Sequence, residues 1–315
     1  MPLIESAYRP RGIFRHAHAS TIIPSMLRKV PAPGYARERL ELADGDFVDL
    51  DRLRNGAVRV AVLCHGLEGD ASRPYMRGMA RALTRAGWDV VAYNYRGCGG
   101  EPNRTARSYH SGATDDLREV LARVLPEYEK TVLVGFSLGG NLVLKYLGEE
   151  GAAAPVAGAV AISVPVDLAD ACDRICSPAN RLYHDRFMRK LRKKIRAKAA
   201  AYPGTVDPGP LDRIRTLVEF DDAYTAPLHG FASAADYYAR CSSLGGLGAL
   251  SVPALLLTAS NDPLLGGSCC PRGAARDSAH LHLEVAEHGG HTGWYAPGGT
   301  YYSEARSVAF LGEYV

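Results

Sequence analysis

Long apolar runs are what this sequence most clearly lacks, since none approaches the about 18 consecutive apolar residues of a membrane-spanning helix. The first residues also lack the basic stretch and apolar segment of a secretion signal. The seven cysteines include no Cys-x-x-Cys pair and no histidine partners at zinc spacing. We therefore expect a cytoplasmic protein with reduced thiols, without a metal ion or other cofactor.

An excess of charge of either sign is missing as well. The chain has 37 basic and 34 acidic residues, a formal net charge of +3, which argues against nucleic acid as a partner. What it does have is length and apolar content: 315 residues, 47% of them hydrophobic, are enough to bury a large core. One elaborated domain is the expected organisation.

Alternating apolar residues between Glu38 and Arg54, around the turn at Asp44-Gly45-Asp46, predict an antiparallel hairpin. After it, short apolar runs alternate with segments of helical period, which indicates a mostly parallel, doubly wound α/β sheet with an antiparallel amino-terminal hairpin. Strands are expected at 58–64, 90–93, 132–134, 156–162, 254–259 and 281–285, and helices at 75–85, 115–125, 141–148 and 303–314.

The alternation stops between Pro165 and Leu250, where helical and irregular segments occur without a strong strand run. We interpret residues 165–250, called the cap segment below, as a helical insertion that lies over the sheet. The predicted core then consists of residues 1–164 and 251–315.

The residues Gly135-Phe136-Ser137-Leu138-Gly139 join an expected strand to an expected helix. This context is typical of the sharp turn that presents a nucleophilic serine in the α/β-hydrolase fold, where glycines two positions before and after the serine prevent a collision. We predict that Ser137 is a nucleophile at the carboxyl edge of the sheet.

A serine hydroxyl needs a base, and the base needs a group that orients it. Asp262 follows the expected strand 254–259, and His291 lies in a glycine-rich loop after the next strand. We predict that His291 is the base and Asp262 the orienting group. His288 is an alternative base, and Asp221 a minor alternative to Asp262.

Two backbone amides should stabilise the negative charge that develops on the substrate carbonyl oxygen. One is expected from Leu138, which starts the helix after the nucleophile. The other is expected from Leu67, in the loop after the strand 58–64. His65 in the same loop is interpreted as a structural residue that bonds the loop backbone.

Taken together, several motifs resemble the YheT-type α/β-hydrolases over nearly the whole chain. They are HGLEG (65–69), NYRGCG (94–99), YHSG (109–112), GFSLGGN (135–141), FDD (220–222), NDP (261–263) and GHTG (290–293). The stretch from Phe14 to Ile23 also resembles the start of that family, although Ala17-His18-Ala19-Ser20-Thr21 stands where an Asn-His-Leu-Gln-Thr type of sequence is usual.

The resemblance implies an esterase-like serine hydrolase with a helical cap, acting on carboxylic esters of short to medium acyl chain. Relatives of this kind include lipases and phospholipases, and also yeast acyltransferases that pass an acyl group to an alcohol. Acyl transfer is therefore an alternative, and so is a catalytically silent scaffold that binds a small ligand.

Residues 186–198 contain eight Lys or Arg, and Phe187, Leu191 and Ile195 recur among them every four residues. This pattern predicts a helix with an apolar stripe opposite a basic face. The helix could contact an anionic membrane surface or steer anionic substrates, or it could simply pack on the body with a solvated face. For the nearby residues Asp221, Asp222 and His229 we expect helix capping or hydrogen bonds between cap segment and body.

Overall fold

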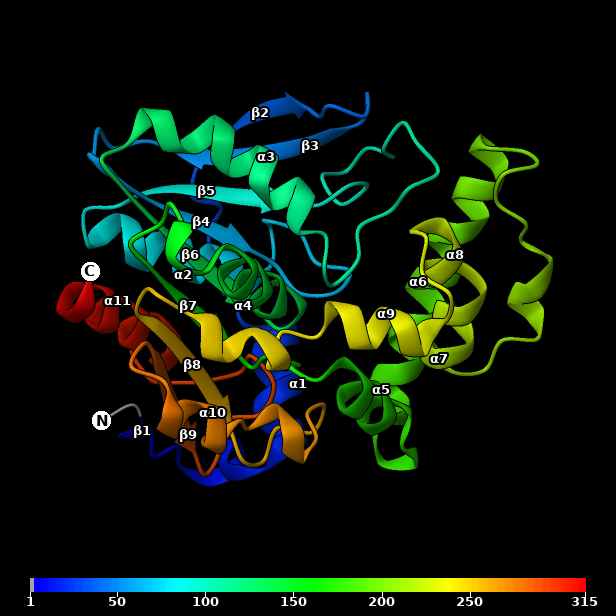
Figure 1. Ribbon diagram of the computed structural model, residues 1–315. Helices are drawn as coiled ribbons and strands as arrows, with labels where there is room; N and C mark the ends of the chain where they lie inside the picture. Colours follow the sequence, from blue (N-terminus) through cyan, green and yellow to red (C-terminus); the bar gives the residue numbers. More distant parts are fainter. Residues whose placement is uncertain (1–2) are drawn as a thin grey trace.

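The computed structural model describes residues 3–315, whose centre is a nine-stranded sheet in the order β1-β9-β8-β7-β6-β4-β5-β3-β2 (Figure 1). The strands are β1 Leu3–Glu5, β2 Ala36–Glu41, β3 Phe47–Leu53, β4 Arg59–Cys64, β5 Asp89–Asn94, β6 Lys130–Phe136, β7 Gly158–Ile162, β8 Ala254–Ala259 and β9 Leu281–Ala286. The pairs β2–β3 and β3–β5 are antiparallel and the other neighbours are parallel, which confirms the predicted hairpin and sheet.

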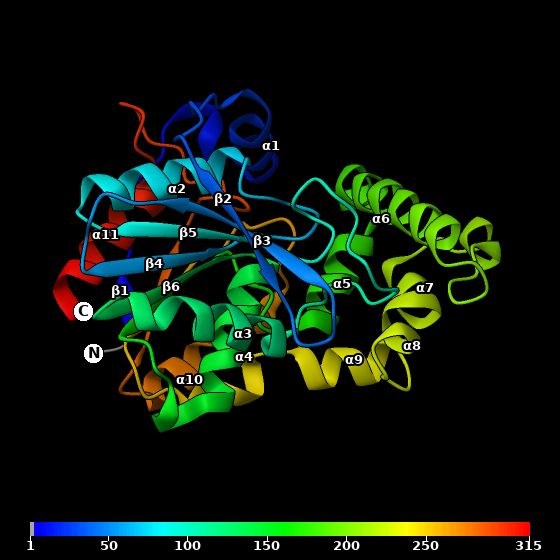
Figure 2. The same cartoon turned by 90° about the horizontal axis from the view of Figure 1, so that it is seen from above.

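Both faces of the sheet are apolar because its central strands alternate between two cores. In β4, Val60, Val62 and Cys64 belong to one buried cluster, while Ala61 and Leu63 belong to the other. Helices α3 (Thr114–Val124), α4 (Leu138–Glu150) and α10 (Arg272–Asp277) cover the first face, and α2 (Pro74–Arg85) and α11 (Tyr302–Tyr314) the second (Figure 2).

The amino-terminal region holds two elements that the sequence patterns did not predict. The three-residue strand β1 pairs in parallel with β9, so the first strand of the chain lies beside the last one. Helix α1 (Ala17–Leu27) follows it and contains Pro24 near its end. A strand this short has no period to detect, and a proline inside a helical pattern normally argues against a helix.

Between β7 and β8 the chain forms helices and irregular segments without a strand, as predicted. The helices are α5 Leu168–Cys176, α6 Arg181–Ala201, α7 Leu217–Phe220, a π-helical turn Asp221–Thr225, α8 Ala226–Leu228 and α9 Ala234–Cys241. They pack around a hydrophobic cluster of their own and lie at one side of the sheet (Figure 1). The division of the chain into core and cap at 164/165 and 250/251 stays a prediction. Within residues 3–315, no helix has the length and apolar content needed to cross a membrane.

Candidate active site

Ser137 lies in a sharp turn between β6 and α4. Its φ of 53° places it in the left-handed region, which is strained for a residue with a side chain. A Cβ atom on Gly135 would collide with the backbone of Gly139, and one on Gly139 with the carbonyl of Cys64. The two glycines are therefore required by the close packing of strand, turn and helix, as the sequence predicted.

The structure brings the three predicted side chains into one hydrogen-bonded chain. His291 Nε2 lies 2.9 Å from Ser137 Oγ, and His291 Nδ1 lies 2.9 Å from Asp262 Oδ2. Because a carboxylate only accepts, Nδ1 carries the proton and Nε2 is left to accept from the serine hydroxyl. This is the geometry in which an imidazole can remove a proton from a serine.

Asp262 is held by the chain just beyond the end of β8. Its amide donates to the carbonyl of Ala259 (3.1 Å), and its Oδ1 accepts from the amide of Leu264 (2.9 Å). The Asp262 side chain is 1% exposed and that of His291 12%, so the carboxylate is shielded while the imidazole reaches the cavity. A shielded carboxylate interacts strongly with the imidazolium that would form during catalysis.

Helix α1 holds the loop that carries His291, a contact that the sequence patterns did not predict. The amide of His291 donates to Thr21 Oγ1 (2.9 Å). Asn261 bridges the two segments, since its side chain accepts from the amide of Gly290 (3.2 Å) and donates to the carbonyl of Arg15 (3.0 Å). The resemblance of the stretch from Phe14 to Ile23 to the family was a sign in the sequence that this region matters. It did not indicate which residue would bond to Thr21.

The two predicted oxyanion residues border the same cavity as Ser137 and His291. Leu138 is the first residue of α4, and Leu67 follows Gly66, where an added Cβ would lie 3.2 Å from Ser137 Cβ. Among residues 3–315, no group accepts a hydrogen bond from the amide of Leu67 or from the amide of Leu138. Their role in stabilising an oxyanion stays a prediction.

His65 has the structural contacts that were expected. It is fully buried, its Nδ1 donates to the Gly66 carbonyl (2.8 Å), and its Nε2 accepts from the amide of Tyr95 (3.3 Å). Burial lowers the pKa of His65 to about 4, which keeps the ring neutral. Both ring nitrogens therefore bond the backbone of neighbouring loops.

The alternative residues lie in other environments. His288 Nε2 accepts from Arg15 Nε (3.3 Å), and Asp221 accepts from Tyr238 (2.7 Å) and Thr225 (2.5 Å) instead of contacting His291. Asp222 accepts from the first amide of α9. His229 Nδ1 donates to the carbonyl of Thr225 (2.6 Å), and its Nε2 accepts from the amide of Ser108 in the body (3.3 Å). The expected capping and cap-to-body hydrogen bonds are thus present.

A cavity of about 150 Å³ lies between the sheet edge and the cap segment. Ser137, Leu138 and His291 form its floor. Its remaining walls are largely apolar and come mainly from the cap segment, with Leu168, Ile175, Phe187, Leu191, Leu217 and Phe220 among them. A largely apolar cavity beside Ser137 is suited to the hydrocarbon part of a ligand.

The basic helix, predicted as residues 186–198, is part of α6, and its charges are distributed differently from the prediction. Phe187, Leu191 and Ile195 line the cavity, as an apolar stripe should. However, Lys190, Lys194 and Lys198 also turn inward and donate to groups of the body. The expected separation into an apolar stripe and an opposite basic face is therefore wrong, because part of the basic set is used in packing.

Comparison with known proteins agrees with this fold. The model of the alpha/beta hydrolase fold family matches residues 60–293. Phospholipase ABHD3 of Mus musculus is 26% identical over 93% of this chain and 74% of its own. The esterase Pf2001 of Pyrococcus furiosus, 16% identical, superimposes with a TM-score of 0.58 over 89% of this chain and 92% of its own. The last similarity concerns the fold alone.

The fold and the matched family model thus define an α/β-hydrolase. Within that class, the chain is 37% identical to YheT of Escherichia coli (strain K12), which bears a provisional name as an esterase, over 92% of this chain and 87% of YheT. The chain belongs to the YheT-type α/β-hydrolases, and the resemblance noted from its motifs is confirmed.

Proposed function

We propose that this hydrolase cleaves carboxylic esters through an acyl-enzyme formed on Ser137. The observation that carries the proposal is the continuous chain of hydrogen bonds from Asp262 through His291 to Ser137, at the floor of an apolar cavity. The names of similar proteins, an esterase and a phospholipase, support the same class of bond.

In this mechanism His291 Nε2 takes the proton from Ser137 as Oγ attacks the ester carbonyl. The amides of Leu67 and Leu138 receive the negative charge on the carbonyl oxygen. His291 then gives its proton to the departing alcohol, and a water molecule, activated by the same imidazole, releases the acid from Ser137. Asp262 stabilises the imidazolium throughout, and no cofactor takes part in any step.

Short to medium acyl chains suit the cavity best. A dry apolar cavity of about 150 Å³ is known to bind a molecule of the size of benzene, and the cavity beside Ser137 has about that volume. A long acyl chain would have to extend beyond it or displace parts of the cap segment. A series of p-nitrophenyl esters from acetate to palmitate should therefore show a maximum of kcat/KM at short to medium chains.

The proposal is tested by labelling the folded protein with a fluorophosphonate probe and mapping the labelled peptide. We expect label on Ser137 and none in Ser137→Ala. Ser111→Ala is the matched control, because Ser111 borders the same cavity. A wild-type protein that hydrolyses esters without label on Ser137 would contradict the mechanism.

Two alternatives are separated by further outcomes of these assays. If ethanol or glycerol captures the acyl group as a new ester more often than water does, the enzyme is an acyltransferase with the same acyl-enzyme. If ester turnover is the same in wild type and Ser137→Ala, the chain is a silent scaffold whose cavity binds a ligand.

A peripheral contact with anionic membranes is proposed for the outer face of α6. Arg186, Arg189, Lys193 and Arg196 are exposed there, and each basic residue near an anionic surface contributes about 1 kcal/mol. Cosedimentation with phosphatidylserine vesicles should decrease in the double variant R189E/K193E. The double variant K29E/R85E, which changes exposed basic residues elsewhere, is the control. Equal binding by both variants would contradict the contact.

A further inference from the structure

Glu68 directly follows the predicted oxyanion residue Leu67 and has an unusual backbone conformation. Its φ of 54° is in the left-handed region, which a residue with a side chain adopts only where the surroundings hold it. Glu68 is the third residue of a turn that is closed by the hydrogen bond from the Gly69 amide to the Gly66 carbonyl (3.0 Å). That carbonyl and the Leu67 amide belong to the same peptide, so the conformation of the turn sets the direction of the Leu67 amide. Whatever holds Glu68 therefore helps to position the Leu67 amide.

Four side chains hold Glu68, and one of them is Arg73, whose guanidinium donates to the Glu68 carbonyl (3.2 Å). Tyr109 Oη accepts from the Glu68 amide (2.8 Å) and donates to Glu68 Oε1 (2.7 Å). Lys194 Nζ donates to the same Oε1 (2.8 Å), and Lys190 Nζ donates to the Glu68 carbonyl (2.9 Å). The amide, the carbonyl and the carboxylate of this one residue are thus all bonded, and both lysines come from helix α6 of the cap segment.

The contact between Lys194 and Glu68 is an ion pair in a largely buried setting. The Lys194 side chain is 21% exposed and that of Glu68 only 9%. Burial would raise the pKa of the Glu68 carboxyl, but the charge of Lys194 and the hydrogen bonds from Lys194 and Tyr109 lower it overall. Both groups stay charged, and removing one partner leaves a shielded charge without compensation.

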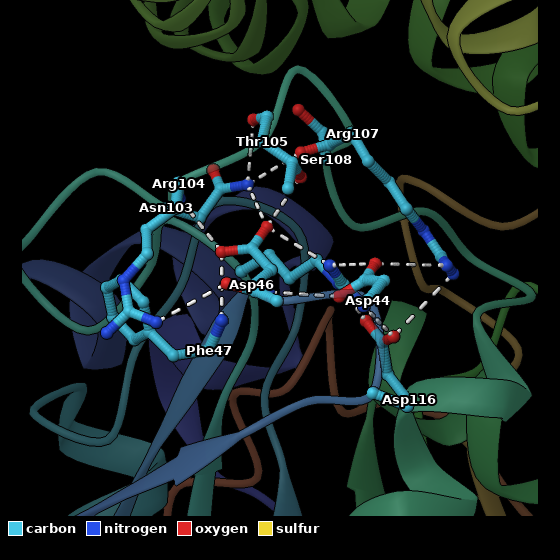
Figure 3. A network of polar contacts seen from close by, with 12 residues as sticks. Asp44, Asp46, Phe47, Asn103, Arg104, Thr105, Arg107, Ser108 and Asp116 are labelled. Carbon is cyan, nitrogen blue, oxygen red and sulfur yellow. Dashed lines mark hydrogen bonds and ion pairs between the residues drawn. The ribbon is translucent and has the colours of Figure 1, made fainter.

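The segment that carries Tyr109 is itself fixed from two sides. Lys198, one turn after Lys194, donates to Asn103 Oδ1 and to the carbonyls of Thr105 and Arg107, each at 2.9 Å. From the sheet side, Asp46 accepts from Asn103 (2.6 Å) and Thr105 (2.7 Å), in the polar network of Figure 3. Tyr109 therefore contacts Glu68 from an anchored loop.

We propose that Lys194 is a positioning residue for catalysis, acting through Glu68 on the Leu67 amide. The inference rests on the proposed function, since it takes Leu67 as a donor of the oxyanion hole. In this arrangement the cap segment does more than line the cavity. A helix inserted between β7 and β8 holds in place a loop that follows β4, and so takes part in stabilising the transition state.

The first test is Lys194→Met in the full-length protein, assayed with a p-nitrophenyl ester of short chain. Removing one oxyanion donor outright costs about 10²-fold to 10³-fold in kcat, and misplacing it should cost less, so we expect a decrease of about 30-fold with KM changed less than threefold. Lys194→Arg should restore most of kcat. Lys29→Met, at an exposed lysine outside the cap segment, should behave as wild type. A higher KM with unchanged kcat would overturn the proposal.

A second readout distinguishes positioning from a general loss of structure. An alkylboronic acid forms a tetrahedral adduct with an active serine and places an oxygen in the oxyanion hole, whereas a fatty acid product does not form this adduct. We expect Lys194→Met to weaken boronate inhibition by about the same factor as kcat, and to leave product inhibition unchanged. Equal weakening of both would overturn the proposal.

Tyr109→Phe tests the same contact from the other side, and remains available if Lys194→Met does not fold. It removes one hydroxyl and should lower kcat and boronate affinity together; unchanged values would count against the inference. If wild-type Ser137 is not labelled by a fluorophosphonate, the proposed function itself fails. If Ser137 is labelled and both variants match wild type, only the role of Lys194 fails.

Discussion

The two halves of the site are held in different ways. On the sheet side, Ser137, Asp262 and His291 lie in loops at the ends of strands. Their positions are fixed by hydrogen bonds of their own backbone and by glycines that admit no Cβ, with the short side chains of Thr21 and Asn261 as partners. On the cap side, helix α6 reaches the body through the long side chains of Lys190 and Lys194. Close packing of the backbone allows only one arrangement of the groups that it holds, whereas contacts through long, flexible side chains allow several.

This difference indicates which property each half controls. Substitutions on the sheet side should abolish the reaction or the fold, because no neighbouring side chain can replace a group whose place is set by the backbone. Changes on the cap side should alter rate and substrate range by smaller factors. The following variants test the division, beginning with the largest expected effect.

Asp262→Asn should lower kcat by about 10⁴-fold with little change in stability, because an amide no longer favours the correct tautomer of His291. Steady-state assays with a short p-nitrophenyl ester measure it. Asp221→Asn, which changes a carboxylate that lines the cavity without contacting His291, should cost less than tenfold. A larger loss for Asp221→Asn than for Asp262→Asn would reverse their roles.

Gly139→Ala should destabilise the fold by about 3 kcal/mol, because the added methyl group would overlap the Cys64 carbonyl. Urea unfolding followed by circular dichroism gives the free energy of unfolding. The control is Gly245→Ala, where no atom lies within 4 Å of the new Cβ. Equal stability of the two variants would show that the turn can shift to make room for a methyl group at residue 139.

Asp221 should make the stability of the cap side depend on pH. Burial raises the pKa of its carboxyl from 3.8 to about 6. The protonated carboxyl therefore contributes its full stabilisation of the folded state below pH 3.8, and this contribution is lost as the pH rises through 6. Relative to Asp221→Asn, wild type should lose about 3 kcal/mol across this window. Urea unfolding at pH 4, 5, 6 and 7 measures the difference. A difference that is constant with pH would contradict the assignment.

Thr21→Val should lower kcat by about tenfold, because the amide of His291 loses its acceptor and such an unpaired group costs about 1–3 kcal/mol. The substitution keeps the shape of the side chain. Thr205→Val, at an exposed threonine of the cap segment, is the control for the same chemical change. Wild-type kcat in Thr21→Val would mean that the loop of His291 is held well enough without α1.

The sheet side could be predicted from the sequence because its signals are local. β8 has the bounds expected from its apolar run, and the glycines around Ser137 give the turn directly. The loops of Asp262 and His291 follow expected strands, which places both at the edge of the sheet where Ser137 lies. The geometry of the three side chains agrees with that expectation, while their roles await the experiments above.

The contacts of the cap side could not be predicted because they join residues far apart in the chain. Lys190, Lys194 and Lys198 recur every four residues, but lysines at such a spacing usually form a solvated face. Only the positions of Glu68 and Asn103 reveal that these lysines have buried partners. Likewise, nothing near Thr21 indicates that its hydroxyl binds a residue 270 positions later.

The pairing of β1 with β9, and the contact of α1 with the loop of His291, set an order of events during protein synthesis. The ribosome delivers Ser137 long before His291, which follows 154 residues later. A nascent chain that ends before His291 therefore has the turn of Ser137 without the imidazole that contacts it. Under the proposed mechanism, hydrolysis therefore starts only after β9 and the loop of His291 have joined the part of the sheet that carries Ser137.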